Sequence, residues 1–384
     1  MTSAQSRPPA FSNETRGAAR ACLDAIEEAE RRQPRHATSP FRAVAAIADS
    51  LGDDGRLSDR ISIVRANAWQ HDSHDAHLDA PSGSALQSAL SLWFKSDHHA
   101  FEKPLLYLFG SQTLDRLRML SLESARRGIL CNDAETRPSI WCKGVQPAIP
   151  LWLASHPDCT PYDPASADET RAILRSALQA LYVNHESGFY YLATHDVTHV
   201  DAGPLRRADA DSAISGMYRL RLKPDANTNG DNEITPQVRL CGAGAALQHV
   251  LHAASLLSRD WGIAAEVWSC PSYTRLAREG RAAERWNMLH PQSPSQRSHI
   301  ARCLGDCTAP VIAVTGYAQH IAEQIAPFAP ARFVAIGATN PSATSGAEFP
   351  GGRWITVIAL KALVDDGALS AQTLEAALRA YALM

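Results

Sequence analysis

Apolar and polar positions alternate along the chain in blocks that predict helices and short buried strands in turn. A first helix is expected over residues 18–32, where apolar residues share one face and charged residues occupy the other. Asn13 is the candidate for its N-terminal cap, and Pro34 limits its C-terminal end. We expect this amphipathic helix to dock on its own protein through the apolar face.

From residue 39 the pattern becomes a regular alternation of helix and strand. Strands are expected at 60–66, 104–111, 128–132, 138–144 and 188–195, and helices at 42–51, 114–127 and 167–183. Short apolar strands that are separated by helices pair into a parallel sheet covered on both faces. Residues 39–200 are therefore predicted to form one doubly wound α/β domain.

Residues 201–237 are polar and rich in Asp, Asn and Gly, which predicts a connector that contains one strand at 216–223. A second α/β unit is predicted over 238–384. Its expected strands lie at 238–242, 264–270, 309–316 and 332–337, and its helices at 242–261, 317–328 and 370–383, with a further apolar segment at 354–364. The prediction is two doubly wound α/β domains in series, preceded by residues 1–38 as a tail with one helix.

Composition and charge exclude several classes of function. The 384 residues contain 37 Lys+Arg and 40 Asp+Glu, a formal charge of -3, so no general attraction to nucleic acid or to an anionic membrane is expected. No apolar run approaches the roughly 18 residues of a membrane span, and the N-terminus lacks a secretory signal. Eight cysteines without a C-x-x-C pair are typical of reduced thiols, so a cytoplasmic location is expected.

Two segments contain residue types that bind cofactors or metals. CGAGAALQHV, 241–250, has the Gly-x-Gly of a nucleotide-binding turn, but Leu247 replaces the third glycine and Glu266 precedes the core of the next strand. A tight strand-to-helix turn is therefore favoured. HDSHDAH, 71–77, has imidazole and carboxylate groups that can bind zinc or iron, but its spacing matches no familiar motif. A solvated loop is favoured there, no metal ligand is assigned, and a metal-dependent function at 71–77 is kept as a third alternative.

The chain resembles a known family from residue 238 onward. VRLCGAGAALQHVLHAASLLSRDW, continuing to ERWNMLHP, is similar to the C-terminal domain of the homodimeric bacterial pyruvate dehydrogenase decarboxylating component, a thiamine-diphosphate protein of the transketolase superfamily. ERWNMLHP, 284–291, is specific to that family. We interpret it as a packed turn that buries Trp286 and Leu289 and that forms hydrogen bonds to the backbone through the side chains of Glu284, Arg285, Asn287 and His290.

The resemblance extends upstream to about residue 39. Residues 39–68, 104–119 and 157–196 are similar to the opening, the centre and the end of the family's pyrimidine-binding domain. The first domain of the family enzyme binds the cofactor diphosphate through Mg²⁺, and its Gly-Asp-Gly motif with the following Asn is not found here. The resemblance therefore implies a partner chain that supplies this domain, with thiamine diphosphate and Mg²⁺ shared in a hetero-oligomer or dimer.

Three segments depart from the family pattern. The family has a glutamate at the end of one strand, which hydrogen-bonds the aminopyrimidine and promotes the form that activates the thiazolium carbon. Its position falls on Asn67, whose amide can hydrogen-bond a ring nitrogen but cannot relay a proton. Segments 145–159 and 336–349 replace active-site loops of the family. Phe109, at the end of the next strand, is the candidate for contact with the aminopyrimidine.

Two functions follow from the resemblance. In the first, the chain is a subunit of a split thiamine-diphosphate enzyme that decarboxylates a 2-oxo acid or transfers an acyl or ketol unit, with Asn67 in the activating position. In the second, the chain is a non-catalytic paralogue that scaffolds or regulates a related enzyme. The amide at the position of the glutamate favours the second function, and the retained architecture is compatible with both.

Overall fold

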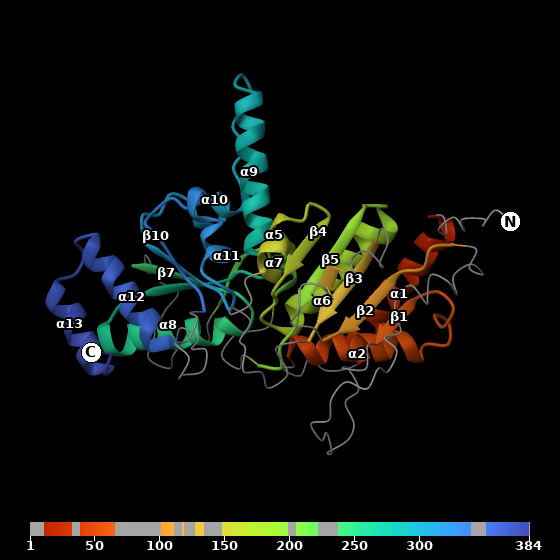
Figure 1. Cartoon of the computed structure of the whole chain (residues 1–384), viewed down its shortest axis with the longest axis horizontal. Coiled ribbons are helices and arrows are strands. Elements are labelled where there is room, and N and C mark those ends of the chain that lie inside the picture. Colours follow the sequence, from red (N-terminus) through yellow and green to blue (C-terminus); the bar gives the residue numbers. More distant parts are fainter. Residues whose placement is uncertain are drawn as a thin grey trace, which may run out of the picture.

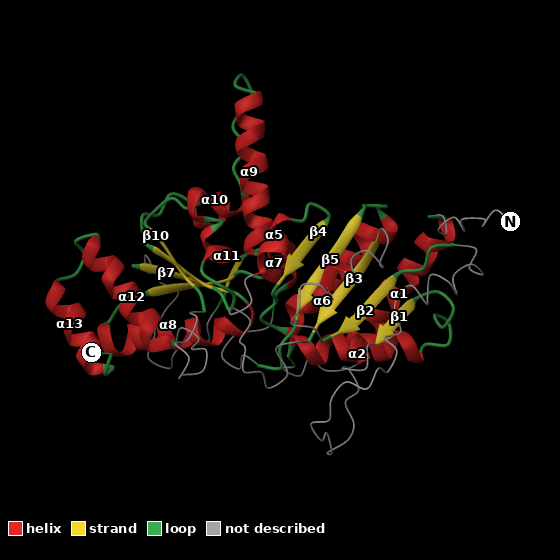
Figure 2. Ribbon diagram, viewed as in Figure 1, coloured by secondary structure: helices red, strands yellow, loops and turns green. Residues whose placement is uncertain are grey.

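Two five-stranded sheets, each covered by helices, make up the chain in a computed structural model that describes residues 11–32, 39–65, 101–110, 117–118, 127–133, 148–198, 205–221, 237–338 and 351–383. Figure 1 and Figure 2 show the two sheets side by side along the long axis of the molecule. The strands of the first sheet lie within 62–193 and those of the second within 218–336. The predicted α/β fold class with two parallel-sheet units is confirmed, while the domain boundaries near 38, 200 and 237 stay predictions.

The first sheet is parallel throughout, with the strand order β1-β2-β3-β5-β4. Its strands are β1 Ser62–Arg65, β2 Leu105–Phe109, β3 Arg127–Asn132, β4 Cys159–Tyr162 and β5 Gly188–Ala193. The central strands are buried along almost their whole length, as expected where helices cover both faces of a sheet. The predicted strand at 138–144 lies outside the described residues, and of the predicted helix at 114–127 only Leu117 and Arg118 are described, in helical conformation.

Helices cover both faces of this sheet. The helices α1 (Asn13–Arg32), α2 (Pro40–Asp53) and α6 (Ala167–Leu178), with the π-helical turn η4 (Gln179–Val183), pack on one face. The helix α5 (Ala148–Ser155) packs on the other. Docking of the first helix on its own protein is thus confirmed. Its predicted start is wrong, because α1 begins at Asn13 and the Ser12 hydroxyl accepts the capping hydrogen bonds of Glu14 N and Thr15 N, 3.2 and 3.3 Å.

The second sheet has the order β10-β9-β7-β8-β6, and only β6 runs antiparallel to its neighbour. Its strands are β6 Tyr218–Arg219, β7 Val238–Gly242, β8 Ala265–Ser269, β9 Val311–Val314 and β10 Phe333–Ile336. The short strand β6 lies inside the segment 216–223 where a strand was predicted. It follows the helix α7 (Arg207–Ser215), which lies in the stretch predicted as a connector.

Two groups of helices cover the second sheet. One face packs against α8 (Leu247–Trp261), α12 (Gly352–Asp365) and α13 (Ala371–Ala380), with the 3-10 turn η5 (Gly244–Ala246) leading into α8. The other face packs against α9 (Tyr273–Leu289), α10 (His299–Leu304), α11 (His320–Glu323) and the 3-10 turn η6 (Ala326–Phe328). None of the helices in the described ranges is long and apolar enough to cross a membrane.

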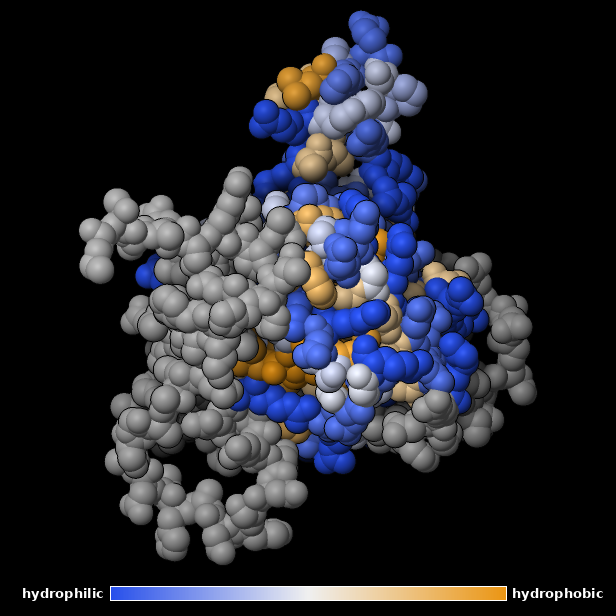
Figure 3. Space-filling view, turned by 90° about the vertical axis from the view of Figure 1, so that its right-hand side faces the viewer, coloured by the Kyte–Doolittle hydropathy of each residue, from blue (hydrophilic) through white to orange (hydrophobic). Residues whose placement is uncertain are grey.

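The helix α9 stands out from the body of the molecule as a spur, and Figure 3 shows apolar surface among hydrophilic surface near its tip. The predicted packed turn at 284–291 is wrong, since the helix continues to Leu289. The Leu289 side chain is 58% exposed, and Trp286 is only partly buried. Within 284–290 only Trp286 and Asn287 are half-buried, and the other residues are exposed, so no face of the helix is buried there.

Two of the predicted side-chain hydrogen bonds in this stretch are confirmed. The Asn287 amide donates to Gln296 O (3.0 Å) and accepts from Gln296 N (2.7 Å), which fastens the chain that returns from the spur. The His290 ring lies 2.8 Å from Trp286 O through Nδ1 and stacks on the Trp286 ring with the centroids 4.6 Å apart. The hydrogen bonds of Asn287 and His290 thus stabilise the end of α9 and the turn in which the chain reverses direction.

Candidate functional site

Buried polar side chains gather at the carboxyl edge of the first sheet, which is where open α/β sheets bind their ligands. Asn132 ends β3, Asp133 follows it, and Thr194 and His195 follow β5; all four side chains are buried. Asn132 Nδ2 donates to the Tyr191 hydroxyl (2.9 Å), and Thr194 donates to Asn132 O through both N (2.8 Å) and Oγ1 (3.0 Å). These bonds fix the ends of the two strands to each other.

His195 is held in a single tautomer. Its Nδ1 accepts from Val197 N (3.2 Å), so the ring proton lies on Nε2, which donates to Pro164 O (3.2 Å). The backbone O of His195 accepts from Phe41 N (3.1 Å) at the start of α2. His195 therefore links β5 to the start of α2 and to the residues between β4 and α6, and both of its ring nitrogens are engaged in that role.

Phe109 ends β2 on the same edge, with a side chain that is fully buried at 0% exposure. Its ring meets the Tyr107 ring edge to face, with the centroids 5.9 Å apart. Asn67 lies outside the described residues, two positions after Arg65, which ends β1 and pairs with Leu108 on β2. The end of β1 and Phe109 are thus on neighbouring strands, and the roles of Asn67 and Phe109 at a cofactor stay predictions.

The other candidate segments lie mostly outside the described residues. This holds for the histidine segment 71–77 and for most of 336–349. Within 145–159, the stretch expected to replace a family loop, residues 148–155 form α5. Within the described ranges no group of three or more His, Cys, Asp or Glu is arranged to hold a metal ion.

The glycine-rich turn after β7 contacts the first unit. Gly244 has a positive φ of 52°, its N donates to Asp163 O (2.9 Å), and a Cβ at this position would lie 2.1 Å from Asp163 Oδ1. Asp163 therefore fills the space in front of the turn where a dinucleotide phosphate would lie. Glu266 lies within β8 and pairs with Arg239 (3.0 Å), both side chains being 7% exposed. The interpretation of 241–250 as a tight structural turn agrees with this geometry.

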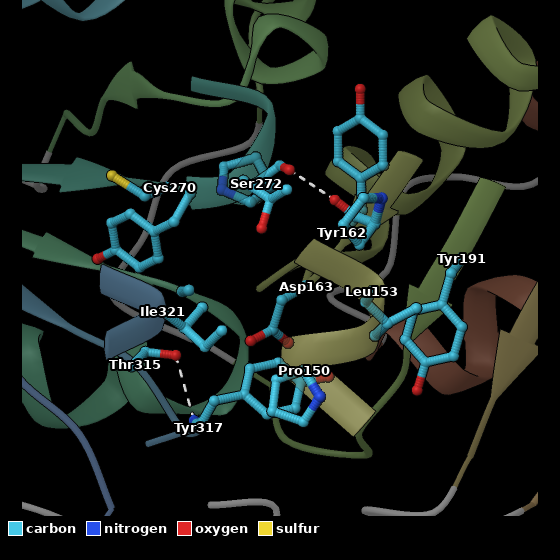
Figure 4. A pocket seen from close by; sticks show the side chains of 15 residues that line it. Pro150, Leu153, Tyr162, Asp163, Tyr191, Cys270, Ser272, Thr315, Tyr317 and Ile321 are labelled. Carbon is cyan, nitrogen blue, oxygen red and sulfur yellow. Dashed lines mark hydrogen bonds between the residues drawn. The ribbon is translucent and has the colours of Figure 1, made fainter. Parts of the chain in front are cut away.

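The space beside this turn is too small for a substrate. Figure 4 shows the side chains of Asp163, Ser272, Thr315 and others around a cavity of about 30 Å³. A cavity of this size holds about one water molecule. We therefore interpret this place as part of the contact between the two units.

Glu169, on α6 of the first unit, joins that unit to the second sheet. Its carboxyl group is fully buried and accepts from the Tyr218 hydroxyl on β6 (2.8 Å), the Ser269 hydroxyl on β8 (2.6 Å) and Ala165 N (2.6 Å). Burial raises the pKa of Glu169 above its usual value, although the three donors act in the opposite direction. The only local sequence signal for Glu169 is the capping pattern Ser166-x-x-Glu169, which gives no hint of the contact between units.

Replacing Glu169 with glutamine is expected to change how stability depends on pH. Because folding raises the pKa, the native state binds more protons than the unfolded state at pH values between the two pKa values. The contribution of Glu169 to the free energy of unfolding therefore falls as pH rises through the folded pKa. Between the two pKa values, the free energy of unfolding falls by at most about 1.4 kcal/mol per pH unit. Urea unfolding from pH 4.5 to pH 8 checks this, since the wild type should lose stability relative to Glu169→Gln as pH rises. Parallel plots of the free energy of unfolding against pH would exclude a raised pKa at Glu169.

Comparison with known proteins supplies relatives for this arrangement. Residues 216–341 match the family model described as transketolase-like TK C-terminal domain. The pyruvate dehydrogenase E1 component of Cupriavidus necator is 34% identical over 285 residues, covering 72% of this chain and 31% of that protein. The E1 component of Pseudomonas aeruginosa is 30% identical over 313 residues, covering 77% of this chain and 35% of that protein.

Among solved structures, the transketolase from Leishmania mexicana aligns with a TM-score of 0.49 at 14% identity, over 95% of this chain and 48% of that one. The chain spans about a third of the length of the curated relatives that it matches.

Proposed function

Because the chain belongs to the transketolase superfamily and is related to pyruvate dehydrogenase E1 components, we propose that it supplies the pyrimidine side of a thiamine-diphosphate site. The site would belong to a cytoplasmic complex that decarboxylates a 2-oxo acid or transfers an acyl or ketol unit. The observation that carries the proposal is the identity of 34% over 285 residues, a stretch too long to be confined to either unit alone. A second polypeptide would supply the domain that binds the diphosphate and Mg²⁺.

Asn67, which follows β1 in the sequence, and Phe109, which ends β2, fit the pyrimidine part of this cofactor by residue type. Asn67 would hold a ring nitrogen by a hydrogen bond, and the buried Phe109 ring would form the apolar floor beneath the carboxyl edge of the first sheet. When bound, thiamine diphosphate supplies a nucleophilic carbon and an electron sink for cleavage beside a carbonyl group. The chain's own contribution is to position the ring and to exclude water from it.

The proposal is supported by the way the two units are joined. The buried Glu169 carboxylate and the contact between Asp163 and Gly244 hold the carboxyl edges of both sheets in a fixed relation. A cofactor site that is shared between polypeptides requires such a rigid half, since reacting groups lose rate steeply when they are misplaced by about 1 Å.

A second function is favoured by Asn67 itself. An amide in the position of the family's glutamate cannot transfer the proton that activates the cofactor, and general acid–base catalysis is worth about 10²–10⁴-fold in rate. A non-catalytic paralogue that scaffolds or regulates a related enzyme would need no such group.

Purification of the chain alone, and together with a polypeptide that carries the diphosphate-binding domain, separates the two functions. If the chain is a subunit of a split enzyme, CO₂ should be released from a 2-oxo acid only when both polypeptides are present, with thiamine diphosphate and Mg²⁺ added. A stable complex that releases no CO₂ beyond the partner's own rate would support the scaffold. Turnover by the chain alone would contradict the need for a partner.

A further inference from the structure

A second cavity, of about 380 Å³, lies between the two units on the side of the spur. It is lined by Thr160 of β4, Ser215 of α7, Arg275, Arg278, Glu279 and Ala282 of α9, and His299 and Arg302 of α10. Figure 1 shows α5 and α10 on either side of the base of α9, where these elements converge. The volume lies within the range of about 300–1,000 Å³ that is typical of small-molecule sites.

Arg275 brings a charge to this cavity that no carboxylate neutralises among the described residues. Its guanidinium lies beside the hydroxyl groups of Tyr162 and Tyr190, both from the first unit. Ion pairs within the described ranges include none to Arg275. A partly buried guanidinium that meets only neutral partners favours an anion nearby, because burial without a counter-charge is costly.

Arg278 is held rigidly beside it. Its Nη2 donates to the carbonyl oxygens of Leu153 (3.2 Å), Ala154 (3.0 Å) and His156 (2.8 Å), and its Nη1 donates to Cys159 O. The first three acceptors belong to the last turn of α5 and the residue after it, at the negative end of the helix dipole, whereas Cys159 begins β4. Arg278 thus joins the units and fixes one wall of the cavity.

The one carboxylate in the described lining is already engaged. Glu279 Oε2 accepts from His299 N (2.7 Å) at the start of α10, and Glu279 Oε1 lies 3.8 Å from Arg302 Nη2. The Arg302 side chain is 56% exposed, so the cavity opens to solvent at that end. The lining therefore carries three guanidinium groups against one carboxylate, together with the hydroxyl groups of Thr160 and Ser215.

We propose that this cavity binds the phosphate group of a small organic phosphate. Guanidinium groups and hydroxyl donors are the groups that hold phosphate oxygens in proteins, and Arg does so bidentately. The cavity has room for more than a free phosphate ion, so an organic substituent is expected on the ligand. Because β4 and α9 both line the cavity, the ligand would bridge the two units and stabilise their contact. This inference does not depend on the proposed thiamine-diphosphate chemistry.

Calorimetric titration of the full chain with glycerol 3-phosphate and with inorganic phosphate, at constant ionic strength in chloride, tests the proposal. Saturable binding is expected for both probes, tighter for the phosphomonoester. Arg302→Gln should raise the Kd by about tenfold or more, the effect expected from the loss of one charge-assisted hydrogen bond. Tighter binding of inorganic phosphate would contradict an organic ligand.

Arg297→Gln is the matched control. Arg297 has a side chain that is 53% exposed, close to the 56% of Arg302, and it pairs with Asp306 outside the lining of the cavity. Its replacement removes the same charge and should change the Kd by less than about twofold. The proposal is overturned if the wild-type chain shows no saturable binding, or if the two variants weaken binding equally.

Discussion

Replacing Asn67 with glutamate is expected to raise the decarboxylation rate of the assembled complex by about 10²–10⁴-fold. The reason is the proton relay: the family's glutamate activates the cofactor through its aminopyrimidine, and the Asn67 amide has neither the negative charge nor a transferable proton. The measurement is the kcat for CO₂ release from the preferred 2-oxo acid by the wild-type and the Asn67→Glu complexes, at saturating thiamine diphosphate.

Asn67→Gln is the control for this variant, since glutamine has the length of glutamate but keeps the amide. It should leave the rate within a few-fold of the wild type. An equal rise in both variants would show that side-chain length, and not the carboxylate, sets the rate. The wild-type complex must first release CO₂ faster than the partner polypeptide alone. If that rate is then the same in both variants, Asn67 does not occupy the activating position.

The second large effect is expected at the contact between the two units. Gly244→Ala should lower the free energy of unfolding by about 3 kcal/mol or more, because the new methyl group meets Asp163 Oδ1 at 2.1 Å and the φ of 52° is unfavourable for alanine. Gly262 is the matched control, with a φ of 64° and no described atom within 4 Å of the position that a Cβ would take. Gly262→Ala should therefore cost only about 1–2 kcal/mol.

Urea unfolding of the two variants gives both values. Adding Asp163→Ala to Gly244→Ala removes the carboxylate that the methyl group would meet, so this double variant should recover part of the lost stability. Equal costs for the two glycine variants would mean that Asp163 and the turn are not in close contact.

Periodicity predicted the elements whose burial follows a simple repeat. The strands β2, β3 and β5 and the helices α6 and α8 lie where apolar spacing placed them, because a parallel sheet with helices on both faces imposes that spacing. Periodicity failed for α9, because from Glu284 onward none of its residues is fully buried and the apolar positions therefore show no one-sided pattern. The helix α5 and the edge strand β4 were missed because both are short and contain proline.

The candidate sites depend on contacts that are distant in the sequence. Glu169 meets Ser269, and Arg278 meets the end of α5, across about a hundred residues or more in each case. No local pattern encodes such pairs. The Gly-x-Gly turn at 242–244 shows the same limit: its sequence suggests a phosphate, whereas the group that faces it is the Asp163 carboxylate.

Calorimetry of cofactor binding decides whether the thiamine-diphosphate site is shared between two polypeptides. Thiamine diphosphate with Mg²⁺ is titrated calorimetrically into the chain, into a partner that carries the diphosphate-binding domain, and into their mixture. A shared site predicts saturable binding in the mixture that is at least tenfold tighter than to either polypeptide alone, a difference of about 1.4 kcal/mol. Binding to the isolated chain as tight as binding to the mixture would contradict it.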